Sequence, residues 1–331
     1  MKTSTVIVLL AFVVASQGSH AGETERKTQE GDADSRSLLL GAPFAVPRAN
    51  YFHTALEVPP FEPARTLERD SVFLRLRTAH VHSAEKRTID GYRNNFDGLY
   101  HEWAALECDW GVIDRLEIGT HIVYAGWDEC IDHFELLDQT GNPIVLDEDR
   151  VIYGTGASKR HDNVSVVGLK AKALLLTAER SGLDLSFAPS VKFPVSRAGD
   201  LTSAGTYDLA FTLLASIPMR RVVLHANLGA TVPLGDQNLF VPEAGIKLNP
   251  FVHGAIGATF TLPSEFAVGI QLEANSSAFR DVELLDDPPF TIVAGVRKLF
   301  GKLVVEVGGG TGLDWSSGYR YSSFFSVGYV F

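Results

Sequence analysis

Histidine and serine side chains of the kind that hydrolyse esters lie together at His80, His82 and Ser83. A serine nucleophile needs a base within hydrogen-bond reach and a third group that orients the base. No G-x-S-x-G or H-E-x-x-H motif specifies such a set in this sequence. Both histidines instead share the alternating phase of Leu74 and Leu76. We therefore expect no catalytic residues, with a lipid hydrolase as the enzymatic alternative.

Two acidic clusters offer oxygen ligands for Ca²⁺, one at 147–149 and one at Asp286 and Asp287. Neither has the spacing of an EF-hand loop, and solvated acids are the commoner case. The sequence therefore predicts no metal site and no cofactor.

A second group of charged residues occurs inside stretches of alternating apolar residues, out of phase with them. Both signs are present, and the charges recur on stretch after stretch. The group comprises Arg75, Arg77, Glu107, Asp109, Arg115, Glu117, His121, Lys170, Lys172, Asp184, Lys192, Asp208, His225, Glu273, Arg297, Glu306 and Arg320. Such placement predicts a polar lumen lined by charge, because strand residues alternate between two faces.

The alternation itself is clearest between Leu209 and Ile217, where the odd positions are apolar and the even ones include Asp208, Thr212 and Ser216. A period of two is typical of a strand with one apolar face. We expect strands near 71–83, 98–110, 113–127, 161–176, 182–194, 204–217, 220–234, 248–262, 265–277, 289–299, 302–312 and 319–331.

Short and long connections alternate along these strands. Tight links such as Pro218-Met219 and Pro263-Ser264 are followed by longer ones, including 84–97, 128–160, 235–247 and 278–288. Bacterial outer-membrane barrels alternate short periplasmic turns with longer outer loops. The sequence therefore predicts an all-β fold, an antiparallel transmembrane barrel of about 12 strands. A soluble β-sandwich is the rival, but strands of about 12 residues exceed the usual 5–6 of soluble sheets.

The first residues indicate export. Lys2 precedes an uncharged run, and Ser19 and Ala21 place small residues three and one before a cut. The apolar part has about 10 residues, whereas a membrane helix needs roughly 20. We expect a signal peptide at 1–21, a disordered tether at 22–38, a periplasmic pre-barrel segment at 39–70 and the barrel at 71–331. Sec-type export and signal cleavage would deliver this chain to the outer membrane.

The net charge and the C-terminal residues indicate which partners to expect. A net charge of -11 argues against nucleic acid, which needs a basic face. Tyr329 and Phe331 end the chain like the C-terminal signal that barrels present to the barrel-assembly machinery. Outer-membrane lipid and lipopolysaccharide, that machinery and a small polar solute are the expected partners.

The two cysteines, Cys108 and Cys130, fall at opposite ends of neighbouring predicted strands. A rise of about 3.3 Å per residue separates them by far more than the roughly 7 Å that a disulfide allows. We expect two free thiols.

Three stretches resemble an uncharacterised, domain-of-unknown-function family of Gram-negative outer-membrane barrels. They are the lead-in from Ala49-Asn50-Tyr51-Phe52 to Val58-Pro59, the stretch Ile131-Asp132-His133-Phe134 with Arg150 downstream, and the end at Phe331. The resemblance implies a transmembrane barrel and brings no known activity.

Two functions fit a charged lumen. Wall charges could select small solutes in a conducting channel, or opposite charges could pair across strands and fill a non-conducting structural barrel. The 39–70 segment could enter the periplasmic opening or lie beneath it. A short helix around Ile131, Phe134 and Leu137 could act as a lid on the outer side or pack on the rim. A channel is the expected function.

Overall fold

A computed structural model describes residues 38–44, 59–89, 92–128, 160–193, 195, 205–235, 247–280, 290–313 and 321–331. Several predictions fall outside these residues. They concern the signal peptide, the lead-in 49–58, the stretch around Ile131, both acidic clusters, Cys130 and Arg320.

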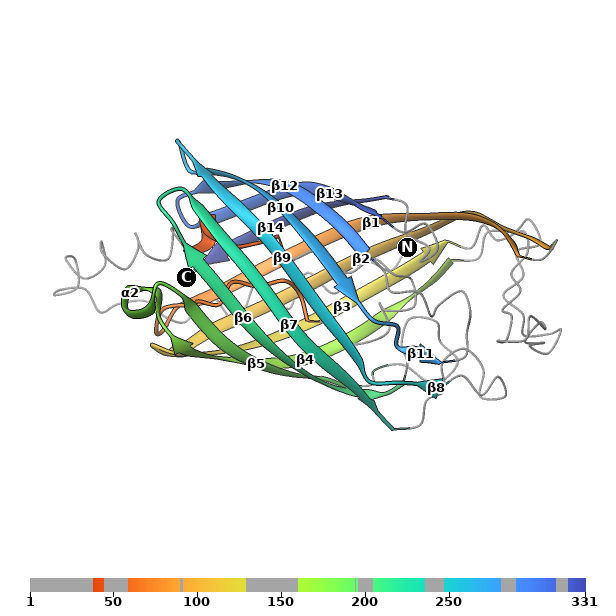
Figure 1. The fold of residues 1–331 in the computed structure, drawn as a ribbon, viewed down its shortest axis with the longest axis horizontal. Coiled ribbons are helices and arrows are strands. Elements are labelled where there is room, and N and C mark those ends of the chain that lie inside the picture. The colour runs from red at the N-terminus through yellow and green to blue at the C-terminus, as the bar shows by residue number, and fades with distance from the viewer. Residues whose placement is uncertain are drawn as a thin grey trace, which may run out of the picture.

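Twelve antiparallel strands form a closed barrel, as Figure 1 shows. The strands are β1 (Val72–Ile89), β2 (Tyr92–Ile113), β3 (Leu116–Asp128), β4 (Arg160–Leu176), β5 (Asp184–Phe193), β6 (Tyr207–Pro218), β7 (Val222–Leu234), β9 (Phe251–Leu262), β10 (Phe266–Asn275), β12 (Phe290–Phe300), β13 (Leu303–Gly312) and β14 (Tyr321–Val330). Pairing between β1 and β14, from Phe73↔Val330 to His82↔Tyr321, closes the barrel. Closure leaves no sheet edge along the wall. The predicted fold class and strand number are confirmed.

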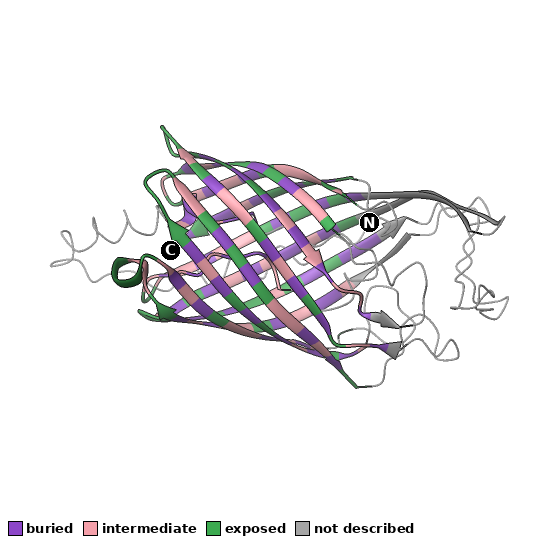
Figure 2. Ribbon diagram, viewed as in Figure 1, coloured by how far each residue is buried: buried purple, intermediate pink, exposed green. Residues whose placement is uncertain are grey.

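Side chains alternate between the inside and the outside of the wall, as the diagonal bands of Figure 2 show. On β6, Thr212 is 2% exposed and Leu213 is 48% exposed. Large apolar residues such as Leu228 and Ile256 point outward, whereas the buried residues include many charged and polar ones. The barrel is therefore apolar outside and holds many charged and polar side chains inside, unlike a soluble sheet packed on an apolar core.

Five short turns, all of them described, lie at the end of the barrel that also holds Val72 and the C-terminus. They span 114–115, 219–221, 263–265 and 301–302, and a fifth contains the four-residue helix α2 (Ala178–Ser181). Phe331 donates its N–H to the Val72 carbonyl at 2.9 Å, which ties the last residue to the first strand. We call this end the turn end and the opposite one the loop end.

The segment predicted as a loop at 84–97 is instead mostly strand. β1 and β2 continue to Ile89 and Tyr92, paired with each other past a bulge between Ser83 and Glu85. Among the described residues, β1 pairs with β14 as far as His82 and β2 pairs with β3 as far as Tyr100, and Figure 1 shows the rest of this ribbon projecting past the rim at the loop end. A ribbon outside the barrel needs no apolar face, and its charged sequence therefore did not predict strands.

A small second sheet also interrupts the predicted loops at 235–247 and 278–288. It pairs β8 (Lys247–Leu248) with β11 (Phe279–Arg280) and continues the β9–β10 hairpin at the loop end. Among the described residues, no helix has the length and apolar character needed to cross a membrane.

Candidate functional site

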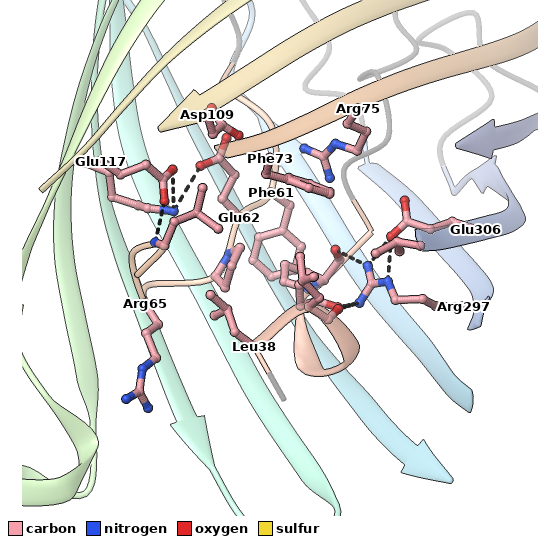
Figure 3. A pocket seen from close by; sticks show the side chains of 17 residues that line it. Leu38, Phe61, Glu62, Arg65, Phe73, Arg75, Asp109, Glu117, Arg297 and Glu306 are labelled. Atoms are coloured by element: carbon pink, nitrogen blue, oxygen red, sulfur yellow. Dashed lines mark hydrogen bonds and ion pairs between the residues drawn. The ribbon is translucent and has the colours of Figure 1, made fainter. Parts of the chain in front are cut away.

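The chain before β1 enters the barrel and fills part of its lumen. We call residues 38–44 and 59–68 the plug. Phe44 and Ala64 are fully buried and Phe61 is 1% exposed, although all three precede the first strand. Figure 3 shows Phe61 and Glu62 surrounded by side chains of the wall at the turn end. Of the two placements open for the pre-barrel segment, these residues adopt the one inside the opening.

Arg297, on the inward face of β12, binds the plug through main-chain carbonyls. Its side chain is 1% exposed. The guanidinium carries five N–H donors and cannot itself accept a hydrogen bond. Nε donates to Glu306 of the neighbouring β13 at 2.6 Å. Nη1 donates to the carbonyls of Leu39 (2.8 Å), Leu40 (3.2 Å) and Ala42 (2.5 Å), and Nη2 to that of Pro43 (3.0 Å). One wall side chain therefore holds the helical turn 38–41 and the two residues after it.

Glu62 anchors the second part of the plug by charge. Its carboxylate lies 2.5 Å from the Lys170 ammonium and 3.8 Å from that of Lys172. Both lysines are also paired with the wall, Lys170 with Asp109 at 3.0 Å and Lys172 with Glu117 at 3.0 Å. Burial alone would raise the pKa of Glu62, but the two ammonium groups outweigh it and lower that pKa to about 2. The carboxylate therefore stays charged while the plug is docked.

Further side chains of the wall, most of them neutral, hydrogen-bond the plug backbone, which forms no regular ladder of its own. Gln271 of β10 accepts from the Phe44 N–H at 3.0 Å and donates to the Phe44 carbonyl at 2.6 Å. The Ala64 N–H donates to Ser216 at 3.0 Å, and Ser186 donates to the Ala64 carbonyl. Thr259 donates to the Ala42 carbonyl at 3.1 Å, and Glu117 accepts from the Leu67 N–H at 2.9 Å. The inward hydroxyl and amide groups thus act as the partners of an irregular segment.

Glycines in the wall make room for the aromatic rings of the plug. A Cβ on Gly269 would lie 2.6 Å from the Phe44 ring, and one on Gly257 would lie 2.9 Å from the Phe61 ring. Real side chains do not approach so closely, so these positions require the absence of a side chain. The plug and the wall are therefore complementary in shape as well as in hydrogen bonding.

Phe44 is also part of an apolar layer inside the barrel. Its ring centroid lies 5.8 Å from that of Phe324, and Trp103 and Val293 belong to the same buried cluster. The layer draws on β1 to β4, β12 and β14. Plug and wall side chains therefore pack against one another in this part of the lumen.

Most of the charged residues predicted for the lumen are buried in the structure. Arg77, Glu107, Asp109, Glu117, Lys172, Asp184, Lys192, Asp208, His225, Glu273, Arg297 and Glu306 are buried, and Arg75, His121 and Lys170 are partly buried. Opposite charges pair across neighbouring strands. Examples are Arg75 and Arg77 with Glu107, and Lys192 with Asp208 at 2.9 Å.

Arg115 is the exception. It was predicted to face the lumen from a strand at 113–127, but it is exposed on the turn between β2 and β3. A register shift between Gly111 and Ile113 ends the regular pairing of β2 early. The two residues that follow form the turn, so Arg115 lies on neither face of the wall.

Tyr329 and Phe331, the predicted assembly signal, are exposed on the outer wall at 41% and 46%. Their ring centroids lie 4.8 Å apart. Cys108 is a partly buried free thiol on β2.

Sequence reasoning missed the residues that bind the plug by neutral contacts, namely Gln271, Ser216, Ser186 and Thr259, and the plug residues Phe44, Phe61 and Glu62. One feature of the sequence could have indicated the plug: prolines at 43, 59, 60 and 63 lie close to Phe44 and Phe61. Prolines restrict the backbone and are typical of a fixed, irregular segment.

A serine–histidine pair does occur, inside the barrel and away from His80. Ser216 Oγ lies 2.9 Å from His225 Nδ1, while His225 Nε2 donates to the Gly41 carbonyl at 2.8 Å. Ser216 also accepts from the Ala64 N–H. Both side chains are thus occupied in holding the plug. Among the described residues, no group of three or more His, Cys, Asp or Glu side chains is placed to bind a metal ion.

A cavity of about 50 Å³ remains beside the plug. Arg75, Asp109, Lys172 and Glu306 line it from the wall, and Phe61 and Glu62 from the plug (Figure 3). This volume has room for a few water molecules among charged groups.

The barrel shares its fold with a solved outer-membrane channel. That protein, the COG4313 outer membrane channel from Pseudomonas putida F1, aligns with a TM-score of 0.61 at 12% identity over 83% of this chain and 100% of its own. The NanC porin (TM-score 0.45, 8% identity, 78% of this chain and 98% of its own) and Salmonella typhi OmpF (0.32, 10%, 78% and 97%) are less similar in structure. At these identities the likeness concerns the fold alone.

No family model and no curated protein matches the sequence. The resemblance to an uncharacterised barrel family therefore stays a prediction.

Proposed function

We propose that this protein is an outer-membrane channel for small solutes whose lumen the plug closes at rest. The polar lining of the lumen supports this most directly. A barrel that is filled permanently gains no stability from buried ion pairs, since well-packed apolar residues of similar volume serve as well or better. Side chains such as Gln271, Ser216 and Lys170, which bind the docked plug, would be solvated by water once it left. A polar wall suits a lumen that is alternately plugged and wet.

The contacts of the plug are compatible with release. In the described residues they are hydrogen bonds, ion pairs and ring packing, with no covalent cross-link between plug and wall side chains. The solute would be small and polar, selected by the wall charges once the plug has moved. Sec-type export, signal-peptide cleavage after Ala21 and insertion by the barrel-assembly machinery complete the proposal.

The alternative is a structural barrel that never conducts. The pairing of wall charges and the apolar layer around Phe44 favour it, because both place packed side chains inside the lumen. A lipid hydrolase is disfavoured, since Ser216 and His225 both bind the plug.

Fractionation and electrical recording of the wild-type protein test the proposal. We expect the protein in the outer-membrane fraction, with different gel mobility before and after boiling. In planar bilayers it should show brief openings from a closed baseline, as the plug leaves and returns. Recovery in the soluble periplasm would contradict the membrane assignment, and a silent but folded and inserted barrel would favour the structural role.

Leu213→Arg tests whether the apolar outer wall contacts lipid. Leu213 lies near the middle of β6 and is 48% exposed. Arginine near the bilayer midplane costs a barrel about 2–4 kcal/mol, but only about 0–1 kcal/mol near the interface. We expect that loss in the free energy of unfolding, measured by urea titration in lipid vesicles. Met219→Arg, on the turn after β6, is the control and should change it little; equal effects would argue against a membrane-embedded wall.

A further inference from the structure

We propose that an anionic phospholipid of the periplasmic leaflet binds to the outer wall over β6 to β12, with its phosphate at basic residues of the turn end and an acyl chain in an apolar groove above them. The proposal rests on the outer-membrane location, which would put the turn end on the periplasmic side. It adds a lipid site that the channel function does not require.

The basic residues lie together in one sector of the rim. Arg220 and Arg221 occupy the β6–β7 turn, Lys302 the β12–β13 turn, and Lys298 the last part of β12. The described residues of these turns and of the β9–β10 turn between them include one acid, Glu265. We call the four cations the basic arc.

The other sector of the rim differs. There the β2–β3 turn carries Asp114 with Arg115, and α2 carries Glu179 with Arg180, so the charges are balanced. The whole chain has a net charge of -11. A local excess of positive charge on an acidic protein is the feature that attracts an anionic membrane surface.

Lys298, one of the four cations of the basic arc, lies on the outer face of the wall. It alternates with inward Arg297 and shares the outer face with Phe300. Its ammonium lies 4.4 Å from the Phe266 ring centroid and 5.5 Å from that of Phe300, and it donates to the Ser264 carbonyl. An ammonium has three N–H groups, so it keeps donors for a phosphate after this bond. Aromatic rings beside a cation are typical of the level of lipid headgroups.

An apolar groove of about 420 Å³ lies on the same wall, toward the middle of the barrel. The residues that line it include small ones, Ala215, Ala226, Gly254 and Ala274, and larger apolar ones, Leu213, Leu228, Ile256 and Leu272. Ala226 is paired with Ala215 and lies five residues along β7 from Arg221. At about 3.3 Å per residue, roughly 17 Å of strand separates them, a distance that an acyl chain spans.

The occupant follows from these two features. An extended apolar groove on a membrane wall takes a hydrocarbon chain, and cations at its headgroup end favour a lipid with net negative charge. Lipopolysaccharide belongs to the leaflet at the loop end, so phosphatidylglycerol or another anionic glycerophospholipid is the expected ligand.

Native mass spectrometry of the folded, full-length mature barrel tests this proposal. In detergent with equal amounts of phosphatidylglycerol and phosphatidylethanolamine of the same chain length, we expect preferential retention of phosphatidylglycerol. Arg220→Gln/Arg221→Gln should reduce that retention by about fivefold for each charge removed. Arg115→Gln/Arg180→Gln, from the balanced sector, is the matched control and should leave it unchanged.

Gly254→Leu tests the groove. A Cβ at this position would meet its nearest neighbour, the Asn227 carbonyl oxygen, at an ordinary contact distance of 3.5 Å, so a larger outward side chain can be accommodated and would fill part of the groove. It should weaken retention of both lipids and leave their ratio intact. Equal retention of the two lipids by the wild type, or a preference that survives removal of Arg220 and Arg221, would overturn the proposal. Gel mobility and bilayer openings, recorded on the same samples, separate that result from failure of the channel assignment.

Discussion

Arg297→Met should release the plug and hold the barrel open. The wild-type guanidinium donates to four plug carbonyls and to Glu306. Methionine has similar length and no donor, so the carbonyls lose their partner and the Glu306 carboxylate loses its nearest counter-charge. Removing one partner of a buried ion pair typically costs about 3–5 kcal/mol. This loss destabilises the docked state of the plug more than the released state. Single-channel recordings should therefore change from brief openings to a sustained open level.

Two variants control this experiment. Arg297→Lys keeps a charge beside Glu306 but cannot reach several carbonyls at once, so it should show an intermediate open probability. Arg180→Met removes an exposed arginine of α2 and should behave as wild type. Gel mobility before boiling checks that the strands of each variant have folded into a complete barrel. A folded Arg297→Met barrel with wild-type gating would mean that Arg297 does not hold the plug.

A disulfide between Gly41→Cys and Val223→Cys should have the opposite effect and keep the plug docked. A Cβ placed on Gly41 lies 3.8 Å from the Val223 Cβ, within the roughly 3.5–4.5 Å found across disulfides. Val223 is on the wall, at the start of β7. Cys108→Ser and Cys130→Ser remove the native thiols so that one pairing is available. Non-reducing mass spectrometry should find the new bond, and either single cysteine alone should leave gating unchanged.

The barrel could be predicted from the sequence because each strand shows its own alternation of apolar and polar residues. Leu209, Phe211 and Leu213 alternate with Asp208 and Thr212, so the outward and inward faces of β6 follow from local order. The same rule assigned the inward side to Arg297 and Glu306, which pair across neighbouring strands. It failed at Arg115, where a one-residue shift at the end of β2 moves a residue from the wall to a turn.

The plug could not be predicted in the same way, because its contacts join residues that are far apart in the chain. Gln271 binds the Phe44 backbone across 227 positions, and Arg297 recognises carbonyl groups that every residue possesses. Gly269 and Gly257 read as ordinary small residues until the rings of Phe44 and Phe61 are placed against them. The charge pattern of a lumen is local, whereas the segment that occupies it is selected by shape and backbone geometry.

Current through one channel carrying the Gly41→Cys/Val223→Cys disulfide, recorded first oxidised and then after reduction in the bilayer, tests the central claim most directly. If the plug gates the lumen, the oxidised barrel stays at the closed baseline and the same channel begins to open after dithiothreitol reaches the turn end. Openings of equal frequency and size before and after reduction, in protein whose disulfide has been verified, would contradict a plug that closes the channel.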